Sequence, residues 1–576
     1  TLLGRDYSLL CEVSEEGKEA RVAYASKVAQ LVRSAEVVDG EDRYDRLALA
    51  MEKAACEVLP KRERSQPGFF EKSKDVLRRL IDKRNDALQL CFRARRVTRQ
   101  NFAILRDSRV QLKRAVEKAK SDWIMAQMDE LNGGANHRNG FQCCWDALKR
   151  LKAGLSKTRK APPKRMRKTD GSLASTPEEN ATVFADHFAA LYGRQAQFDW
   201  SVVDEIPVLP VLVDLDSLPS DIEIFTAIRR LRNTAPGCSG LKAAAFKALL
   251  ASDATQQEIK AVVVDVWENE TMPRAWEVGL LAILPKKGDL ADAGNHRGIM
   301  MLEVAYKIVS IILHGRLTTL SKGLDHESQC GFRPKRGTMD GIFSLKLALK
   351  KRRGHGLERW VYFLDLVKAF DRVPRELLWI ILAKFGAPPK LIRLLKLLHA
   401  VIKVSFCVDG VEVTLDSIIG VKQGDILGPI LFVIFMAAIT ITWKKLHNYR
   451  LCIYRSKPDW VISGRRWNTG SHSDEFAVSD SLYADDSALL FCSRRDVVSE
   501  CPKVNAHFDR FGMEVDARAP ADSKPAKSEV LFVAAPGIMY DNPATFSDEG
   551  ADGIVRPRDL SDIDVGNGTC PVVEHF

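Results

Sequence analysis

The sequence has no Cys-x-x-Cys pair and no apolar run as long as a membrane span. Its 12 cysteines are scattered over 576 residues without one Cys-x-x-Cys pair, which argues against a structural zinc module and for reduced thiols inside a cell. The longest apolar run, Gly428 to Thr442, is shorter than the ~18–20 residues of a membrane span and predicts a buried helix. No secretory signal is visible, so we expect an intracellular chain without a membrane partner.

Glycine and proline are both absent from Phe69 to Asn132, where apolar residues recur at helical spacing. This pattern predicts one long helix or a helical hairpin. Residues 61–170 also carry 30 Lys and Arg against 12 Asp and Glu, a local charge of +18, and the rest of the chain carries −7. A concentrated basic segment indicates a polyanionic partner, and the alternative is a solvated helix face.

Three aspartates carry the chemical signal. The stretch Tyr483-Ala484-Asp485-Asp486 lies between apolar segments and predicts the tip of a hydrophobic hairpin. Two charges ~4 Å apart repel by about 4 kcal/mol at an effective dielectric near 20, and a divalent cation would remove this cost. Taken alone, such a pair is most often only a turn. A third carboxylate, Asp365, lies in the predicted buried strand 361–367, where a lone charge is costly unless it is paired or metal-bound; the alternative is an exposed strand end.

Three carboxylates from two strands are what two-metal phosphoryl or nucleotidyl transfer requires. Four further polar blocks stand in a fixed order before and between them, namely Leu284–Asp289, Asn295–Ile299, Gln329–Thr338 and Gly420–Phe432. Their order and spacing resemble the reverse transcriptases of non-LTR (LINE-type) retrotransposons from about Ala235 to Val533, and more weakly back to residue 70. One departure is Ser239, which stands where the family usually has Asp in a turn.

The resemblance implies an α+β fold, with the fingers and palm of a right-hand polymerase preceded by an all-helical basic N-terminal extension. It implies an RNA-directed DNA polymerase that adds dNTPs to the 3′-hydroxyl of a DNA primer on an RNA template. Its cofactor would be two Mg²⁺ ions, with Mn²⁺ as a substitute. It also implies a ribonucleoprotein of nucleus and cytoplasm. Two alternatives stay open: a truncated, inactive RNA-binding remnant of such an element, and another palm-type polymerase such as a group II intron maturase.

The expected domains follow the same comparison. The helical extension would cover residues 1–152, a linker 153–177, a connecting helix and loop 178–214, the fingers and palm 215–535, and a tail leading to a missing primer grip 536–576. By this expectation the sequence is a fragment without the family's endonuclease, primer grip and thumb. Neither the activity of such a fragment nor its oligomeric state follows from the sequence.

The resemblance also assigns roles to individual residues. The catalytic metal ligands would be Asp365, Asp485 and Asp486. The residues expected to bind the incoming nucleotide are Arg297 at the triphosphate, Phe370 under the sugar, Gln423 and Gly424 beside the base and sugar, and Lys527 as proton donor to pyrophosphate. A bulky ring at Phe370 would exclude a 2′-hydroxyl, and the alternative is a core Phe.

Contacts to the nucleic-acid strands are expected from two blocks. The residues are Lys286, Lys287, Arg336, Gly337 and Thr338. A solvated lysine pair is the alternative for the first two. The neighbouring Lys524 competes with Lys527 for the role of proton donor.

Overall fold

The computed structural model describes residues 5–35, 42–61, 69–70, 73–93, 99–134, 148, 165–193, 197–286, 288–324, 327–354, 358–400, 402–422, 424–447, 453–455, 475–477, 479–517, 527–533, 562–566 and 568–573. The chain divides into two compact units, one formed by Lys61–Lys164 and the other by Thr1–Pro60 with Arg165–Phe576. A boundary therefore falls at residue 60, inside the segment 1–152 that the sequence predicts as one extension.

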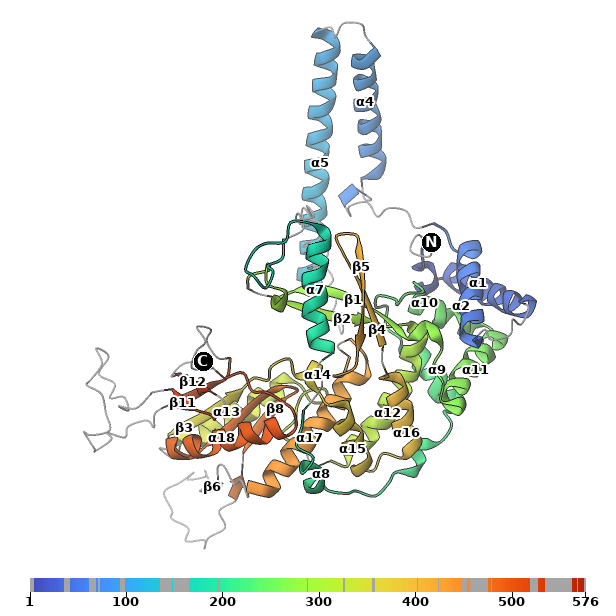
Figure 1. The fold of residues 1–576 in the computed structure, drawn as a ribbon. Helices are drawn as coiled ribbons and strands as arrows, with labels where there is room; N and C mark the ends of the chain where they lie inside the picture. Colours follow the sequence, from blue (N-terminus) through green and yellow to red (C-terminus); the bar gives the residue numbers. More distant parts are fainter. Residues whose placement is uncertain are drawn as a thin grey trace, which may run out of the picture. The chain divides into compact units, whose positions relative to one another are not determined.

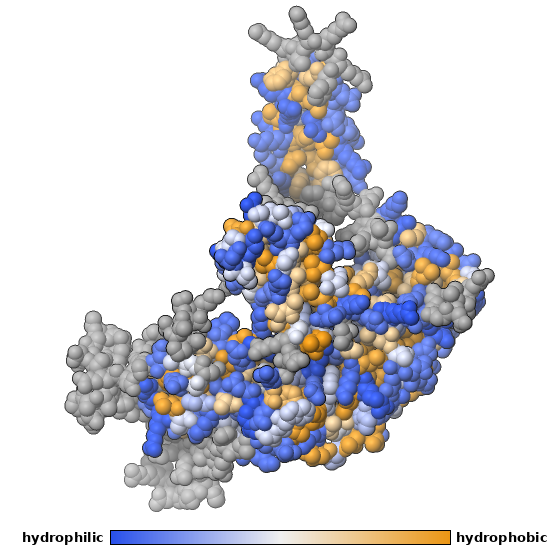
Figure 2. Space-filling model, viewed as in Figure 1, coloured by the Kyte–Doolittle hydropathy of each residue, from blue (hydrophilic) through white to orange (hydrophobic). Residues whose placement is uncertain are grey.

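The smaller unit is a helical hairpin of α4 (Lys74–Arg93) and α5 (Arg99–Gly134), which is the second of the two forms expected for this segment (Figure 1). Leu77, Leu105 and Trp123 are buried. Across the hairpin, Lys83 Nζ donates a hydrogen bond of 3.1 Å to Gln111 Oε1. Figure 2 shows a column of hydrophobic residues along the hairpin with hydrophilic residues on both sides. The basic side chains thus surround a narrow apolar seam.

The larger unit begins with α1 (Glu15–Ser34) and α2 (Arg43–Val58), which pack beside α10 (Ala243–Ala248) and α11 (Asp253–Asn269). Arg43 Nε lies 3.0 Å from Asp265 Oδ2, and the Tyr44 ring meets Trp276 edge-on at 5.4 Å. These contacts, far apart in sequence, attach residues 5–60 to the main body. They explain why the boundary falls at residue 60.

A four-stranded sheet has the order β2-β1-β4-β5. Its strands are β1 (Val278–Pro285), β2 (His296–Met301), β4 (Ile402–Val408) and β5 (Val411–Ser417). The β4–β5 hairpin turns at Asp409-Gly410, a dipeptide that favours such tight turns. Helix α7 (Pro177–Tyr192) packs against β5, and its N-cap Thr176 accepts a hydrogen bond from Glu179 N at 3.2 Å.

A five-stranded sheet has the order β13-β10-β3-β9-β8. Its strands are β3 (Arg359–Leu364), β8 (Asp480–Tyr483), β9 (Asp486–Phe491), β10 (Glu529–Val533) and β13 (Val572–Val573). Alternate residues point to opposite faces. Val361 and Leu531 pack with α13 (Thr338–Gly354) on one face, whereas Tyr362 on the other bonds Asn505 of α18 (Arg494–Arg510). Helices thus cover both faces.

The main core surrounds α17 (Leu427–His447), the buried helix predicted from the long apolar run. The helix is longer than the apolar run seen in the sequence, so the expectation that it is too short for a membrane span is wrong by length and composition alone. However, 78% of the window Leu427–Lys445 is buried inside the protein, as in a core helix. Helices α12 (Val304–Lys322), α15 (Arg375–Lys384) and α18 pack on α17. Behind them, α9 (Asp221–Arg230) packs on α12 and α16 (Pro389–Leu398) packs on α15. Shorter elements are α8 (Val202–Glu205), α14 (Ala369–Arg372), β6 (Ile453–Arg455), β7 (Glu475–Ala477), β11 (Ile563–Asp564) and β12 (Thr569–Cys570).

Candidate active site

The three predicted carboxylates lie at one end of the five-stranded sheet. Strand β3 ends directly before Asp365, a two-residue turn that contains Asp485 joins β8 to β9, and Asp486 is the first residue of β9. Leu364 pairs with Ser487 in the antiparallel register of β3 and β9, so the next position brings Asp365 opposite Asp486. Strands β3 and β9, which are far apart in sequence, therefore present these residues at the same end of the sheet, called the carboxylate edge below.

The carboxylates oppose one another's ionisation. Burial raises the pKa of Asp485, and the negative charge of Asp365 raises it further, while the positive charge of Arg297 lowers it. Burial also raises the pKa of Asp486, and the charges of Asp485 and Asp365 add to that effect. A cation at this edge would favour the ionised form of all three groups.

Lys527 supplies one such cation. Its Nζ lies 3.2 Å from Asp365 Oδ2 and 2.9 Å from Asp516 Oδ2. Desolvation lowers the pKa of Lys527, but the hydrogen bond to Asp516 and the charge of Asp365 outweigh it, so the pKa is raised. The ammonium therefore stays protonated at neutral pH. Behind it, the buried Ser528 hydroxyl accepts a hydrogen bond of 3.1 Å from Asp365 N and fixes the end of the strand.

The donor set suits a divalent metal by its chemistry. Carboxylate oxygens are the hard ligands that Mg²⁺ and Mn²⁺ take. Within the ranges that the structure describes, however, no group of three or more His, Cys, Asp and Glu side chains has the spacing that holds a metal ion. The side chain of Asp365 is turned to Lys527 instead. The three carboxylates therefore suit a divalent metal by their chemistry and because they lie at the same end of the sheet. The Lys527 ammonium neutralises one of them, Asp365.

A cavity of about 670 Å³ opens beside this edge. Seven of the predicted site residues line it: Asp365, Asp485, Lys286, Arg297, Phe370, Gly424 and Lys527. Two predicted residues, Lys287 and Gln423, lie outside the described residues. The structure thus brings Asp365, Asp485 and four of the five predicted nucleotide residues around one space, although they come from both sheets and from the loops between them. Asp486 is exposed and does not line the cavity.

Positive charges gather on one wall of this cavity. Desolvation lowers the pKa of Lys286, and the nearby charges of Arg297 and Lys368 lower it further. Among these cations lies Asp371, where burial raises the pKa to about 6 although Lys368, Lys286 and Arg297 oppose the rise. Like charges held together in a concave site attract an anionic ligand such as a polyphosphate.

Phe370 both packs in the core and faces the cavity. Its ring stacks on Phe432 with centroids 4.5 Å apart and meets Phe332 edge-on at 6.4 Å. The two roles weighed from sequence are therefore compatible. Gly424 has φ 106°, and an added Cβ would lie 2.6 Å from the carbonyl oxygen of Met300 in β2. Only glycine fits this close approach of two backbones.

The remaining predicted block stands at the start of α13 and does not line the cavity. Arg336 Nη2 lies 2.6 Å from Glu327 Oε2, and Gly337 N donates a hydrogen bond of 2.7 Å to Asp340 Oδ2. Thr338 is the first residue of the helix. The block is an ordered, exposed loop that could meet a nucleic-acid strand, and that role stays a prediction.

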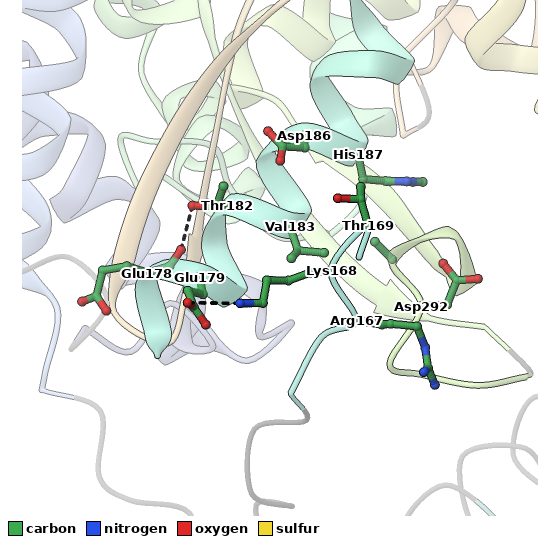
Figure 3. A pocket seen from close by; sticks show the side chains of 11 residues that line it. Arg167, Lys168, Thr169, Glu178, Glu179, Thr182, Val183, Asp186, His187 and Asp292 are labelled. Atoms are coloured by element: carbon green, nitrogen blue, oxygen red, sulfur yellow. Dashed lines mark hydrogen bonds and ion pairs between the residues drawn. The ribbon is translucent and has the colours of Figure 1, made fainter. Parts of the chain in front are cut away.

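Helix α7 contributes cavity residues that the sequence did not indicate. His187, Phe188 and Tyr192 of this helix also line the cavity. Burial lowers the pKa of His187 to about 4, helped by the charge of Lys368, so the imidazole is neutral at pH 7. A second cavity of about 700 Å³ lies beside α7, and His187 also lines it. Figure 3 shows its lining residues, among which Lys168 is paired with Glu179; their N–O distance is 3.2 Å. Its wall carries charges of both signs and none of the predicted catalytic residues.

A buried polar network under the cavity was also missed. The Nζ of Lys422 donates a 3.2 Å hydrogen bond to Tyr306, whose hydroxyl donates one of 2.7 Å to Asp425 Oδ2. Burial lowers the pKa of Lys422 to about 7, although the charge of Asp425 opposes this. The available signal was that Lys422 and Asp425 stand together in the block Gly420–Phe432. Gln329 belongs to the block Gln329–Thr338, and the resemblance implies no role for it.

Comparison with known proteins agrees with the motifs. Residues 284–518 match the family model described as reverse transcriptase (RNA-dependent DNA polymerase). The "uncharacterized 149 kDa protein" of transposon TX1 from Xenopus laevis is 30% identical over 179 residues, which cover 31% of this chain and 14% of that protein. The "RNA-directed DNA polymerase from mobile element jockey" of Drosophila melanogaster is 27% identical over 365 residues, and that of Drosophila funebris 26% over 368. Each alignment covers 60% of this chain and 38% of the relative.

The matched region contains Asp365, Asp485 and most of the residues that line the cavity between the sheets. Residues 284–518 therefore form a reverse transcriptase domain. The retrotransposon relatives support a reverse transcriptase of the non-LTR, LINE type, which confirms the resemblance drawn from the motifs. The chain spans well under half the length of the curated relatives it matches.

Proposed function

We propose that this chain contributes the polymerase site of a non-LTR retrotransposon and copies RNA into DNA. The four-stranded sheet with α7 would act as the fingers, and the five-stranded sheet as the palm. One observation carries the proposal: the carboxylate edge and the cationic wall face the same cavity, as a reaction of a nucleoside triphosphate with a primer hydroxyl requires.

Each part of the cavity has a distinct task in this proposal. Divalent metal ions bound by Asp365, Asp485 and Asp486 would supply the positive charge that activates the primer 3′-hydroxyl and neutralises the leaving pyrophosphate. Arg297, with its planar bidentate donor group, binds the triphosphate. Lys527, protonated at neutral pH, gives a proton to the leaving pyrophosphate.

The sugar and the base of the incoming nucleotide meet the other wall. The ring of Phe370, fixed by its stack on Phe432, blocks a 2′-hydroxyl and so selects dNTPs. Gly424 lets the backbone approach the nucleotide, with Gln423 beside it. The block Arg336-Gly337-Thr338 contacts the template strand, and the basic α4–α5 hairpin binds RNA backbone. We also propose that the protein works as a ribonucleoprotein in nucleus and cytoplasm.

Primer extension on an RNA template with Mg²⁺ and dNTPs tests the proposal. The full chain should extend the primer, and Asp365→Asn or Asp485→Asn should lower the rate by more than ~10³-fold, because several kcal/mol of transition-state stabilisation are lost. The exposed Asp214→Asn serves as the control and should behave as wild type. Extension at the wild-type rate by Asp365→Asn would overturn the assignment.

The same assay separates a second candidate, a non-catalytic RNA-binding remnant. The ion pair between Lys527 and Asp365 favours it, because it occupies a carboxylate that the metal needs. A wild-type chain that binds RNA in a salt-dependent manner but never extends a primer, with Mg²⁺ or Mn²⁺, would establish that candidate instead.

A further inference from the structure

A short segment before α13 runs along the strand that leads into the catalytic turn. Leu482 N of β8 donates a hydrogen bond of 2.9 Å to Ser328 O, and Cys330 N donates one of 2.8 Å to Leu482 O. Gln329 and Leu482 thus form a parallel bridge. The segment therefore pairs with the outer side of β8 over one bridge and places the side chain of Gln329 beside the turn between β8 and β9.

The amide of Gln329 bonds to both backbone polar groups of Ala484. Its Oε1 accepts hydrogen bonds from Ala484 N at 2.9 Å and from Gly331 N at 2.7 Å. Its Nε2 donates one of 3.4 Å to Ala484 O. The side chain is 2% exposed, so water does not compete for these bonds. The amide oxygen therefore uses both of its acceptor sites, one for Ala484 of the turn and one for Gly331 of its own segment.

Ala484 needs such support because its backbone is in the left-handed region, at φ 57°. Residues with a Cβ avoid this conformation, which persists only where the surroundings enforce it. Gly331 packs directly on the turn: an added Cβ there would lie 2.4 Å from Ala484 N. Since Ala484 immediately precedes Asp485, its conformation decides where Asp485 and Asp486 point.

We propose that Gln329 is a positioning residue for the polymerase reaction, with its amide holding Ala484 in the left-handed conformation that directs Asp485 toward the cavity and sets the start of β9 at Asp486. The inference rests on the proposed function for its catalytic consequence. Its structural half, the link from Gln329 to the turn, stands apart from that function and can be measured without turnover.

Gln329→Met removes the amide and keeps the length of the side chain. The full chain carrying it should lose about tenfold to a hundredfold in kcat, the range set by the strain of one backbone residue, while KM for dNTP changes by less than about threefold. Hydrogen exchange at the Ala484 amide should accelerate, and Mn²⁺ binding without substrate should weaken. Cys330→Ala, a buried neighbour in the same segment, is the matched control and should change none of these readouts.

A second change in the turn can tell whether Gln329 positions Ala484 or only fills space in the core. Glycine adopts positive φ without strain, so Gln329→Met combined with Ala484→Gly should recover most of the lost kcat. A residue that only filled the core would not be rescued by a change in the turn. An unchanged exchange rate at Ala484 in Gln329→Met, or a double variant as slow as the single one, would refute the positioning role.

The outcomes also separate the two proposals. A wild-type chain without primer extension would sink the proposed function, and the exchange and Mn²⁺ measurements would still decide whether Gln329 holds the turn. An active wild type with a fully active Gln329→Met variant would sink only this inference.

Discussion

Asp371 lies among the cations of the cavity and should lower the stability of the native protein at neutral pH. Burial raises its pKa from the ordinary 3.8 to about 6, even with Lys368, Lys286 and Arg297 nearby. One pKa unit corresponds to about 1.4 kcal/mol, so the ionised carboxylate destabilises the native state by about 3 kcal/mol. Asp371→Asn removes this charge and should raise the free energy of unfolding by up to about 3 kcal/mol at pH 7, less whatever a lost hydrogen bond costs.

The pH dependence follows from the direction of the shift. A carboxyl with a raised native pKa is protonated in the native state but ionised in the unfolded state between about pH 4 and 6. The wild type therefore loses stability as pH rises through this window, and the penalty is complete above it. The advantage of Asp371→Asn should vanish near pH 4 and be constant above pH ~7.

Urea unfolding of both proteins, measured at steps from pH 4 to pH 8, checks this. The exposed Asp204→Asn should follow the wild type at every pH and controls for the loss of one carboxylate. A stability difference for Asp371→Asn that stays the same at all pH values, or a variant less stable than wild type at pH 8, would refute the reasoning.

Two other predictions concern the substrates. Phe370→Val should lower the discrimination between dNTP and rNTP, measured as the ratio of kcat/KM, by roughly tenfold to a hundredfold, and an unchanged ratio would assign the ring to the core alone. Replacing the exposed Arg78, Arg79, Lys113 and Arg114 of the hairpin by Gln should weaken binding to single-stranded RNA. The log–log salt slope should become shallower by about 0.7 per lost phosphate contact, whereas Asp485→Asn should leave it unchanged.

The elements that place the carboxylates could be predicted because their signals are local. Alternating or continuous apolar runs ended by polar turns predict β3, β8 and β9, and Asp409-Gly410 predicts the β4–β5 turn. Strand β3 ends at Leu364, three residues before the predicted end, and Lys368 beyond it has φ 50°. The strand shortens because the chain turns sharply into α14 there.

Long-range partners could not be predicted in the same way. His187 reaches the cavity because α7 packs on β5, a contact between residues more than 200 positions apart. The burial of Lys422 depends on Tyr306 of α12, which lies more than 100 positions earlier in the chain. Residues 5–60 look continuous with the basic hairpin in sequence, yet Tyr44 and Arg43 bind the larger unit.

One departure from the family pattern gains a reason from the structure. Ser239 stands where the family usually has Asp, and its hydroxyl donates a hydrogen bond of 2.6 Å to Glu303 Oε2, while its backbone N donates one of 2.8 Å to Oε1. Glu303 is 1% exposed. An Asp at this position would place a second negative charge against a buried carboxylate, so a neutral donor suits this chain better.

The charged groups around the cavity form a set of carboxylates and a set of cations, and like charges repel one another within each set. Burial and mutual repulsion raise the pKa values of Asp485 and Asp486, and burial with neighbouring cations lowers that of Lys286. Lys527 links the sets through Asp365 and relieves only part of this cost. A bound metal would relieve the carboxylates and a triphosphate the cations, so binding the two together stabilises both sets at once. The repulsion and burial of these charges lower the stability of the free protein, and binding of metal and triphosphate relieves this cost. Charge-removing variants should therefore gain stability and lose activity.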